Sequence, residues 1–357
     1  MSARGGRELT VIVPGLFGPA PPAGADAEAA VETLVSALDL SAMEILLSRA
    51  RVMPAVGSWE SPEALVFSAF GYRFSAGDCP VAAATRIVDI GDSVQDHWLL
   101  RADPVHLKPD MGDLVLFDGD HFALDLDEAK ALAEMIAAHF SDLGWRLDVG
   151  HPLRWYLSLD APARIQTTPL SMVRLRNVDP YLPTGDDAGV WHGLLNETQM
   201  LLHDCAVNRS REARGEAAVN SLWFWGGGVL PQAQPGDWSR VHGDSALLEG
   251  LAEYAGVESR PLPDDAVAWL DTLGEGRHLA LIETGHGPAR ASDVEGWRDF
   301  IADLSANWLD PLLRALGEGR LQSVTVLTDR DLRYHAGRLR WWHRLKARRR
   351  FSRLAQS

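Results

Sequence analysis

The sequence has little cysteine and no long apolar run. Cys79 and Cys205 are the only cysteines among 357 residues, and they lie far apart. Two distant thiols form neither a disulfide framework nor the spacing of a zinc site, which favours a reducing compartment. No stretch of about 18 apolar residues occurs, and the short polar start before Leu9 lacks the apolar core of a signal peptide. These absences predict a cytoplasmic protein without a transmembrane segment.

Positive charge is also scarce, except at one end of the chain. The formal net charge of −15 disfavours binding to nucleic acid or anionic membranes over the whole surface. Residues 338–357 are the exception, because this basic tail also carries Trp341, Trp342, Leu345 and Phe351 and predicts an amphipathic helix. We expect the tail to dock on the acidic face of its own chain, or to contact a partner in a homodimer or another protein. Binding to a membrane or nucleic acid through the tail is the alternative.

What the sequence does contain is ample material for a core. Hydrophobic residues make up 46% of the chain and charged residues 23%, with 13 tryptophans. Short β-branched runs alternate with helix-spaced segments, which predicts a doubly wound, mostly parallel α/β sheet. The expected strands are 9–13, 220–225, 278–283 and 324–328. The expected helices are two within 26–51, the second with Ser41 as its N-cap, and one each over 63–70, 186–205 and 293–316.

The middle of the chain has a different pattern. Strand-like segments at 98–102, 113–117, 145–149 and 155–159 surround one helical segment at 127–143. This order predicts a smaller α+β domain inserted into the α/β core. The predicted core domain comprises 1–89 and 176–337, the inserted domain 90–175, and the tail 338–357.

Ligands of open α/β sheets bind beyond the carboxyl ends of the strands. Four segments fall at such ends in the expected strand order: Pro14-Gly15, Gly226–Gly228, Glu283–His286 and Asp329. They are the first places to look for a site.

Two segments in the second half of the chain resemble a known protein family. The stretch Asn208–Gly215, followed by Asn220-Ser-Leu-Trp-Phe-Trp-Gly-Gly-Gly228, resembles archaeal-type cofactor-independent phosphoglycerate mutases of the alkaline phosphatase superfamily. Phe70-Gly-Tyr72, Arg101-Ala-Asp103 and His286 match in the same order. The resemblance implies an alkaline-phosphatase-like core, an inserted substrate-binding domain, two divalent metals and a serine nucleophile that carries a phosphoryl group.

A narrower resemblance concerns the segment Leu195–His203 beside Trp223–Gly228, with Asp103–His106 upstream. These segments resemble bacterial regulatory proteins of the RpfE type, which are relatives of the mutases. This likeness implies regulation without a defined molecular activity.

The chain departs from the family pattern at the metal ligands. Where the family has Asp-Gly, Asp and Asp-His, this sequence has Pro14-Gly15, Ile282 and Asp329-Arg330. Neither proline nor a guanidinium can ligate a metal. The ligands that remain are Glu283, His286, Asp329 and His335. We therefore expect no cofactor, or a single weakly bound Mn or Zn ion.

The nucleophile that the resemblance implies falls on Ser58 or Ser61, and the sequence does not choose between them. Each serine has a second interpretation as the N-cap of the helix that begins near Glu63. For a serine before an apolar run, the N-cap interpretation is favoured.

Candidate ligand-binding side chains lie in and after the inserted domain. The set comprises Arg101, Asp103, Asn208, Arg211, Arg214, Asn220 and Trp225. Arginines offer bidentate contacts to phosphate or carboxylate, whereas a salt bridge between Arg101 and Asp103 is the structural alternative. One face of the predicted helix carries Asn196, Gln199 and His203. These side chains either line a cleft or form a buried polar network.

Together these observations favour a phosphoglycerate-mutase-like protein with a degenerate metal site, acting as a non-catalytic regulatory or phosphometabolite-binding protein. An active metal-dependent mutase or phosphotransferase with a rebuilt site is the alternative. A regulator that associates with membrane or nucleic acid through its basic tail is the third hypothesis.

Overall fold

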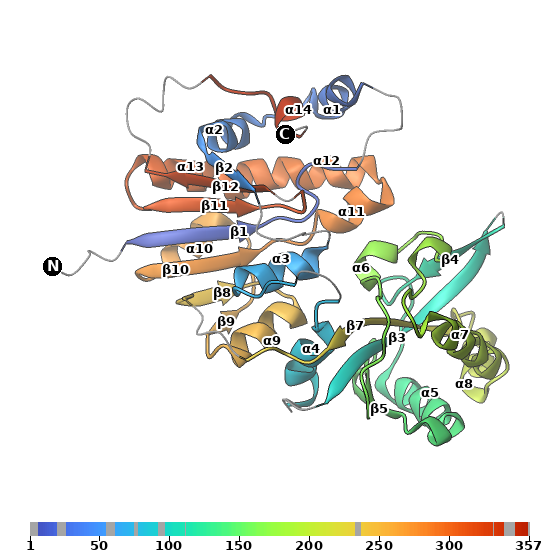
Figure 1. The fold of residues 1–357 in the computed structure, drawn as a ribbon. Helices are drawn as coiled ribbons and strands as arrows, with labels where there is room; N and C mark the ends of the chain where they lie inside the picture. The colour runs from blue at the N-terminus through green and yellow to red at the C-terminus, as the bar shows by residue number, and fades with distance from the viewer. Residues whose placement is uncertain are drawn as a thin grey trace. The chain divides into compact units, whose positions relative to one another are not determined.

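The computed structural model describes residues 6–19, 26–54, 61–74, 78–91, 97–110, 112–232, 237–330, 332–338 and 347–355. The chain divides into two compact units, drawn as a ribbon in Figure 1. Unit 1 comprises Met1–Arg73 and Gln234–Ser357, and unit 2 comprises Phe74–Ala233. No helix in the described part of the chain is long and apolar enough to cross a membrane.

Unit 1 is a mixed α/β unit. Its strands are β1 (Arg7–Ile12), β2 (Arg51–Pro54), β8 (Arg240–His242), β9 (Ser259–Arg260), β10 (Gly276–Leu281), β11 (Ser323–Leu327) and β12 (Leu332–Gly337). Its helices are α1 (Ala27–Val35), α2 (Ser41–Arg49), α3 (Pro62–Ala69), α9 (Ala246–Tyr254), α10 (Ala266–Thr272), α11 (His286–Ala291), α12 (Val294–Asp303), a π-helical stretch (Leu304–Leu309), α13 (Asp310–Gly317) and α14 (Phe351–Leu354).

The strands of unit 1 form one sheet in the order β2-β12-β11-β1-β10-β8-β9. From β11 to β9 neighbouring strands run parallel, and β12 and β2 add an antiparallel edge. The first strand of the chain lies at the centre, with Val11 beside Ala280 on one side and Val326 on the other. All three residues are buried, as a central strand covered on both faces requires. The expectation of a mostly parallel α/β sheet is confirmed.

Side-chain caps explain where several helices begin. Asp26 accepts hydrogen bonds from two backbone N–H groups at the start of α1, and Asp293 accepts one at the start of α12. Each cap satisfies a donor that the first turn leaves free. The helix expected over 293–316 is thus present, although a π-helical stretch interrupts its middle.

The described end of the basic tail packs on unit 1. Phe351 and Leu354 are buried and belong to the same hydrophobic core as β1, α2 and α12. Figure 1 shows α14 between α1 and α2. Of the predicted helix, 339–346 lies outside the described residues, and α14 is its helical part among the rest. The described tail therefore docks on its own chain.

Unit 2 is an α+β unit. Its strands are β3 (Trp98–Asp110), β4 (Asp113–Phe117), β5 (Arg146–His151), β6 (Arg154–Leu159) and β7 (Ser221–Gly228). Its helices are α4 (Val81–Ile90), α5 (Leu126–His139), α6 (Leu170–Val173), α7 (Ala188–His203) and α8 (Ala206–Ala213), with 3₁₀ turns at Ser141–Leu143 and Asp179–Tyr181.

The long strand β3 organises unit 2. It pairs antiparallel with β4, β6 and β7 at different parts of its length, and β5 continues the sheet beyond β6. Trp225 of β7 lies opposite Arg101, and Trp223 lies opposite Asp103. The sequence analysis placed residues 176–233 in the core domain, whereas the structure places them in unit 2. This pairing is the reason, because it ties the tryptophan-rich strand to a strand more than a hundred residues earlier.

Candidate functional site

The strand ends of the unit 1 sheet meet at one edge because the strands are parallel. The ladder continues past β1, since the Val13 amide donates to the Leu327 carbonyl and the Ile282 amide donates to the Ile12 carbonyl. This edge carries Pro14-Gly15 after β1, Asp244 after β8, Glu283 after β10 and Asp329 after β11. Three of the four strand-end segments that the sequence analysis named thus lie at one edge of unit 1, whereas Gly226–Gly228 ends β7 in unit 2.

The loop after β1 is held tightly at this edge. The Gly15 amide donates a hydrogen bond of 2.9 Å to Oδ2 of Asp329. Gly15 has a φ of +78°, and a Cβ atom there would lie 2.5 Å from the Gly285 carbonyl oxygen. Only glycine permits both the left-handed backbone and this close approach. The loop after β1 is therefore bonded to Asp329 after β11 and lies in close contact with Gly285 in the loop after β10.

The side chain of Arg330 contacts protein groups of the loop after β1 and of the tail. Its guanidinium donates to the Phe17 carbonyl at 3.2 Å and to the Ala355 carbonyl, and it lies 5.5 Å from the centre of the Phe17 ring. Burial lowers the pKa of Arg330 from its usual value. The family resemblance implies a histidine ligand at this position. In this chain the residue there is Arg330, which bonds the loop after β1 and the tail.

Carboxyl groups gather on the other side of the edge. The pKa of Glu283 is raised to about 7 by desolvation of its carboxyl group and by the carboxylates of Glu63 and Asp244, against a hydrogen bond from Ser245. Glu283 as a whole is nevertheless an exposed residue. Glu63 contributes a buried carboxylate oxygen that has no hydrogen-bond partner among the described residues. A carboxyl with such a pKa exchanges its proton near neutral pH.

The described residues do not fit a metal centre. No group of three or more His, Cys, Asp or Glu side chains in the described part of the chain is arranged to hold a metal ion. Glu283, His286 and Asp329 are all described, so the structure does not gather these three predicted ligands into one set. The strand ends also lack donors where Pro14 and Arg330 stand. The two-metal site that the resemblance implies is not supported by this arrangement.

Of the two nucleophile candidates, Ser58 lies outside the described residues and Ser61 begins α3. The Ser61 hydroxyl accepts a hydrogen bond of 3.2 Å from the Ala64 amide, and the residue is buried. This is the N-cap role that the sequence favoured for such a serine.

Unit 2 pairs Arg101 with Asp103 in its interior. Nε and Nη2 of Arg101 donate to the two carboxylate oxygens at 2.8 and 2.7 Å. Asp103 also accepts hydrogen bonds from Nε1 of Trp225 at 2.7 Å and from the Trp155 amide at 3.3 Å. Burial raises the pKa of Asp103, while Arg101 and these donors act against the rise. The pair is a salt bridge, as one interpretation of the sequence held, but it is buried rather than exposed.

The Asn–Arg–Gly segment is bonded within unit 2. Asn208 donates to the Leu202 and Val219 carbonyls and accepts from the Val219 amide, and it is buried. Asn220 bonds both the amide and the carbonyl of Leu107. These side-chain amides bond backbone N–H and C=O groups within unit 2. Their contacts therefore stabilise the fold.

The two arginines of this segment have carboxylate partners. Arg211 is almost completely buried, and its three nitrogens donate to the Ala217 carbonyl, the Ala123 carbonyl and Glu128. Arg214 pairs with Glu128 and Glu216 at the surface. Arginines with such partners are poorly placed to receive a phosphate group.

Sequence reasoning missed a second charged cluster in unit 2. Asp89 receives two hydrogen bonds from Arg154 at 2.7 and 2.5 Å and one from the Tyr156 hydroxyl. Burial acts to raise the pKa of Asp89, but these donors lower it overall. The guanidinium of Arg101 lies 5.5 Å from the centre of the Tyr156 ring, so the cluster adjoins the Arg101–Asp103 pair. No short motif marks these residues, because their partners are 65 or more positions apart in sequence.

A cavity of about 270 Å³ lies elsewhere in unit 2, between α7 and the sheet. The residues around it include Leu107, Leu195, Trp223, Asn196 and Gln199. Two of the three polar residues on the predicted helix face thus line a cavity. The lining has no lysine or arginine, so it does not suit a phosphorylated ligand.

The chain is similar in sequence to phosphoglycerate mutases. It is 27% identical over 228 residues to the 2,3-bisphosphoglycerate-independent phosphoglycerate mutase of Methanosarcina acetivorans, which covers 60% of this chain and 55% of that protein. It is 25% identical over 232 residues to a probable enzyme of the same name from Geobacter sulfurreducens, with the same coverage. The chain spans about half the length of these curated relatives. No protein-family model matches it.

A solved structure shares the fold. The PH0037 protein of Pyrococcus horikoshii covers 93% of this chain and 88% of its own, with a TM-score of 0.51 and 14% identity. The alternation of strands and helices, the mostly parallel sheet and the sequence likeness agree. The chain is a mixed α/β protein that is similar to 2,3-bisphosphoglycerate-independent phosphoglycerate mutases.

Proposed function

We propose that this protein is a non-catalytic relative of the phosphoglycerate mutases and acts in regulation, as its resemblance to RpfE-type regulatory proteins suggests. One observation carries the proposal: the two side chains at the end of β11 are used within the fold. Asp329 accepts from the Gly15 amide, and Arg330 donates to the Phe17 and Ala355 carbonyls. Residues that would handle metal and phosphate in an enzyme of this type here support the loop and tail.

The chemistry of phosphoryl transfer explains why this matters. Metal ions clamp the transferring group and neutralise the charge that develops on its oxygens. A site with Pro14 and Arg330 at two ligand positions has lost donors and gained a cation. Metal affinity falls steeply when ligands are removed, so stoichiometric binding is not expected.

The test combines metal content with turnover. The purified chain is incubated with Mn and Zn, and the bound metal is measured by elemental analysis beside a 3-phosphoglycerate to 2-phosphoglycerate assay. The Methanosarcina acetivorans relative serves as the positive control. We expect no stoichiometric metal and no turnover. Metal-dependent turnover by this chain would refute the proposal.

Binding of a phosphorylated small molecule is the alternative non-catalytic role. Arg101 and Arg211 are already paired with carboxylates, which favours a regulatory role over phosphometabolite binding. A thermal shift with 3-phosphoglycerate, with sulfate as the control anion, separates the two. A shift specific to the metabolite would restore the binding role.

The second candidate function is a phosphotransferase with a rebuilt site. It is supported by Glu283, whose pKa of about 7 beside Glu63 and Asp244 is typical of catalytic carboxyl groups. If the assay shows turnover, Glu283→Gln should abolish it, and Glu275→Gln, at an exposed residue before the start of β10, should not. Turnover that survives Glu283→Gln would exclude this cluster as the active site.

A further inference from the structure

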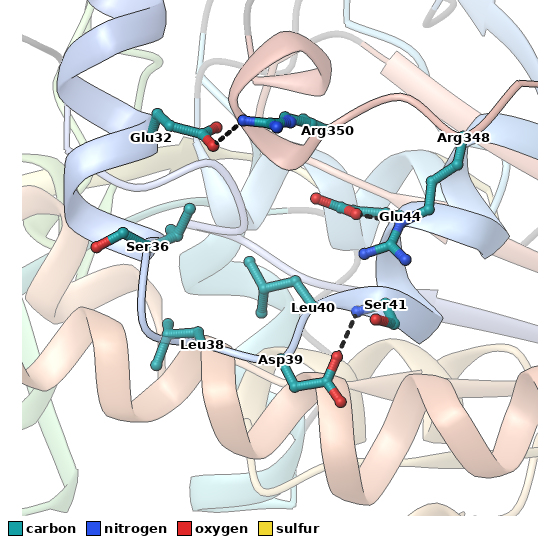
Figure 2. A pocket seen from close by; sticks show the side chains of 10 residues that line it. Glu32, Ser36, Leu38, Asp39, Leu40, Ser41, Glu44, Arg348 and Arg350 are labelled. Atoms are coloured by element: carbon teal, nitrogen blue, oxygen red, sulfur yellow. Dashed lines mark hydrogen bonds and ion pairs between the residues drawn. The ribbon is translucent and has the colours of Figure 1, made fainter.

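The described end of the tail, residues 347–355, is bound to unit 1 by a seam of charges. Arg348, Arg350 and Arg353 pair with one glutamate each of α1 and α2, at 2.5, 2.5 and 2.9 Å, and the partners are Glu44, Glu32 and Glu28. Figure 2 shows Arg350 directed toward Glu32 and Arg348 lying against Glu44. Between 50% and 72% of each arginine side chain is exposed, so water and salt reach these pairs.

Two glutamates of the seam also bind the tail outside these arginines. Glu44 accepts from the Phe351 amide at 2.8 Å, and Glu32 accepts from the Ser352 hydroxyl at 2.8 Å. These bonds fix the direction in which the segment crosses α1 and α2. The docking is therefore specific, and not a general attraction between charges of opposite sign.

The apolar part of the docking is small but central. Phe351 is completely buried, with its ring centre 5.8 Å from that of Phe17 and 6.2 Å from that of Trp297. Phe17 belongs to the loop after β1, and Trp297 donates from Nε1 to the Gly15 carbonyl at 3.0 Å. The anchor of the tail thus packs on the two aromatic residues that shape this loop.

Arg330 connects the tail to the same loop a second time. Its guanidinium bonds the Ala355 carbonyl of the tail and the Phe17 carbonyl of the loop. The neighbouring Asp329 holds the Gly15 amide. One short segment after β11 therefore fixes both ends of the Gly15–Phe17 turn and the end of the tail.

The seam is not closely packed along its whole length. A cavity of about 400 Å³ lies beneath the arginines, and Glu32, Asp39, Glu44, Arg348 and Arg350 are among the residues that line it (Figure 2). The pocket is open to solvent and includes exposed lining residues such as Asp39, so the strap does not cover this part of α1 and α2. Exposed ion pairs contribute little to stability, and ordering nine residues has an entropic cost that opposes docking.

We propose that residues 347–355 are a detachable strap that holds the loop after β1 in place, with Arg330 as the positioning residue that couples the two. When the strap is docked, the Gly15–Phe17 turn and Asp329 are fixed at the carboxyl edge of the sheet. When the strap detaches, Phe17 and Arg330 lose their partners and the edge loosens. The strap is thus a conformational switch for the candidate site. The proposal stands apart from the proposed function, because it needs neither metal nor turnover.

Hydrogen exchange of the full-length chain, read by mass spectrometry, tests the coupling. Phe351→Ala removes the anchor, and we expect exchange to rise about tenfold or more in peptides covering both 347–355 and 14–18. Arg349→Gln is the matched control, because its side chain makes no ion pair among the described residues and should change neither peptide. Faster exchange in the strap alone would overturn the coupling.

A second variant separates the link from the anchor. Arg330→Gln leaves Phe351 in place but removes the guanidinium that spans Phe17 and Ala355. We expect faster exchange in peptides 14–18, with the strap affected less than by Phe351→Ala. An unchanged loop in this variant would remove Arg330 from the mechanism.

Salt and concentration complete the test. Raising NaCl from about 0.05 to about 0.5 M screens exposed ion pairs, so exchange of the strap should increase while peptides of β1 stay protected. Exchange in the strap should not depend on protein concentration, because strap and docking surface lie in one chain. Protection that grows with concentration would overturn the intramolecular strap and indicate exchange of the segment between two copies.

Discussion

Polar side chains are used differently in the two units. In unit 2, Arg101, Asp103 and Asn208 are buried and bonded to one another or to the backbone of the same unit. At the carboxyl edge of the unit 1 sheet, Glu283 is exposed with a raised pKa, and Glu63 keeps a buried oxygen without a hydrogen-bond partner among the described residues. The residues that carry the family likeness most visibly therefore maintain the fold. The residues that would decide the chemistry lie where the sequence departs from the family.

The largest effect is expected from breaking the buried pair of unit 2. Asp103→Asn leaves the Arg101 guanidinium without a countercharge in the interior, which costs about 3–5 kcal/mol of unfolding free energy. Urea unfolding followed by tryptophan fluorescence measures the loss, because Trp225 bonds Asp103 directly. Asp187→Asn, in an exposed pair with Arg164, is the control and should change little. Equal losses of unfolding free energy in the two variants would mean that the buried pair of unit 2 stabilises the fold no more than an exposed pair does.

A somewhat smaller effect is expected for Asn208→Ala. The change leaves the Val219 amide and the Leu202 carbonyl without their partners in a buried place, at about 2–3 kcal/mol. Asn196→Ala, on the exposed surface of α7, should be nearly neutral. The same unfolding experiment measures both. A neutral Asn208→Ala variant would indicate that the amide serves a ligand rather than the fold.

The pH dependence of unit 1 sharpens the comparison. Burial and the charge of Arg240 lower the pKa of His242 from 6.5 to about 4, and Nδ1 of His242 accepts a hydrogen bond from Nε1 of Trp269. The folded state therefore favours the neutral ring, and its contribution to stability is lost as pH falls from about 6.5 toward 4. His242→Gln keeps an acceptor for Trp269 and should flatten the stability profile over this window. An unchanged slope would contradict the assignment.

The smallest change is expected at the exposed seam of the tail. Arg353→Gln removes one ion pair with Glu28, so its effect on unfolding should be near the limit of detection and should vanish in high salt. Thermal unfolding at low and high ionic strength measures this. A loss that persists in high salt would mean that Arg353 acts through packing instead of charge.

Much of the fold could be predicted from local patterns. The runs at 9–13, 278–283 and 324–328 are short and mostly apolar, and all three lie in the middle of the unit 1 sheet. Asp26 and Ser61 begin helices, as their side chains suggested. The boundary of unit 2 could not be read in this way, because the pairing of β7 with β3 depends on contacts between distant residues.

The candidate site was predictable only in part. Strand ends located the carboxyl edge, and the absence of ligand side chains at Pro14 and Arg330 is visible in the sequence. The roles of Asn208 and Arg211 could not be predicted, because the sequence does not show whether a polar side chain in a motif binds a ligand or a backbone carbonyl. Both side chains donate to backbone carbonyls. The partner of Glu283 was also hidden, because Glu63 is more than two hundred residues away.

The central place of β1 has a consequence for how the protein is made. Residues 7–12 leave the ribosome long before their neighbours in the sheet, 276–281 and 323–327. Unit 2 is complete at residue 233, so its contacts are available for folding before the unit 1 sheet can close. During synthesis, β1 is therefore an apolar strand without its partners until β10 and β11 have been made. The chain is therefore most exposed to aggregation and to chaperones before β10 and β11 emerge.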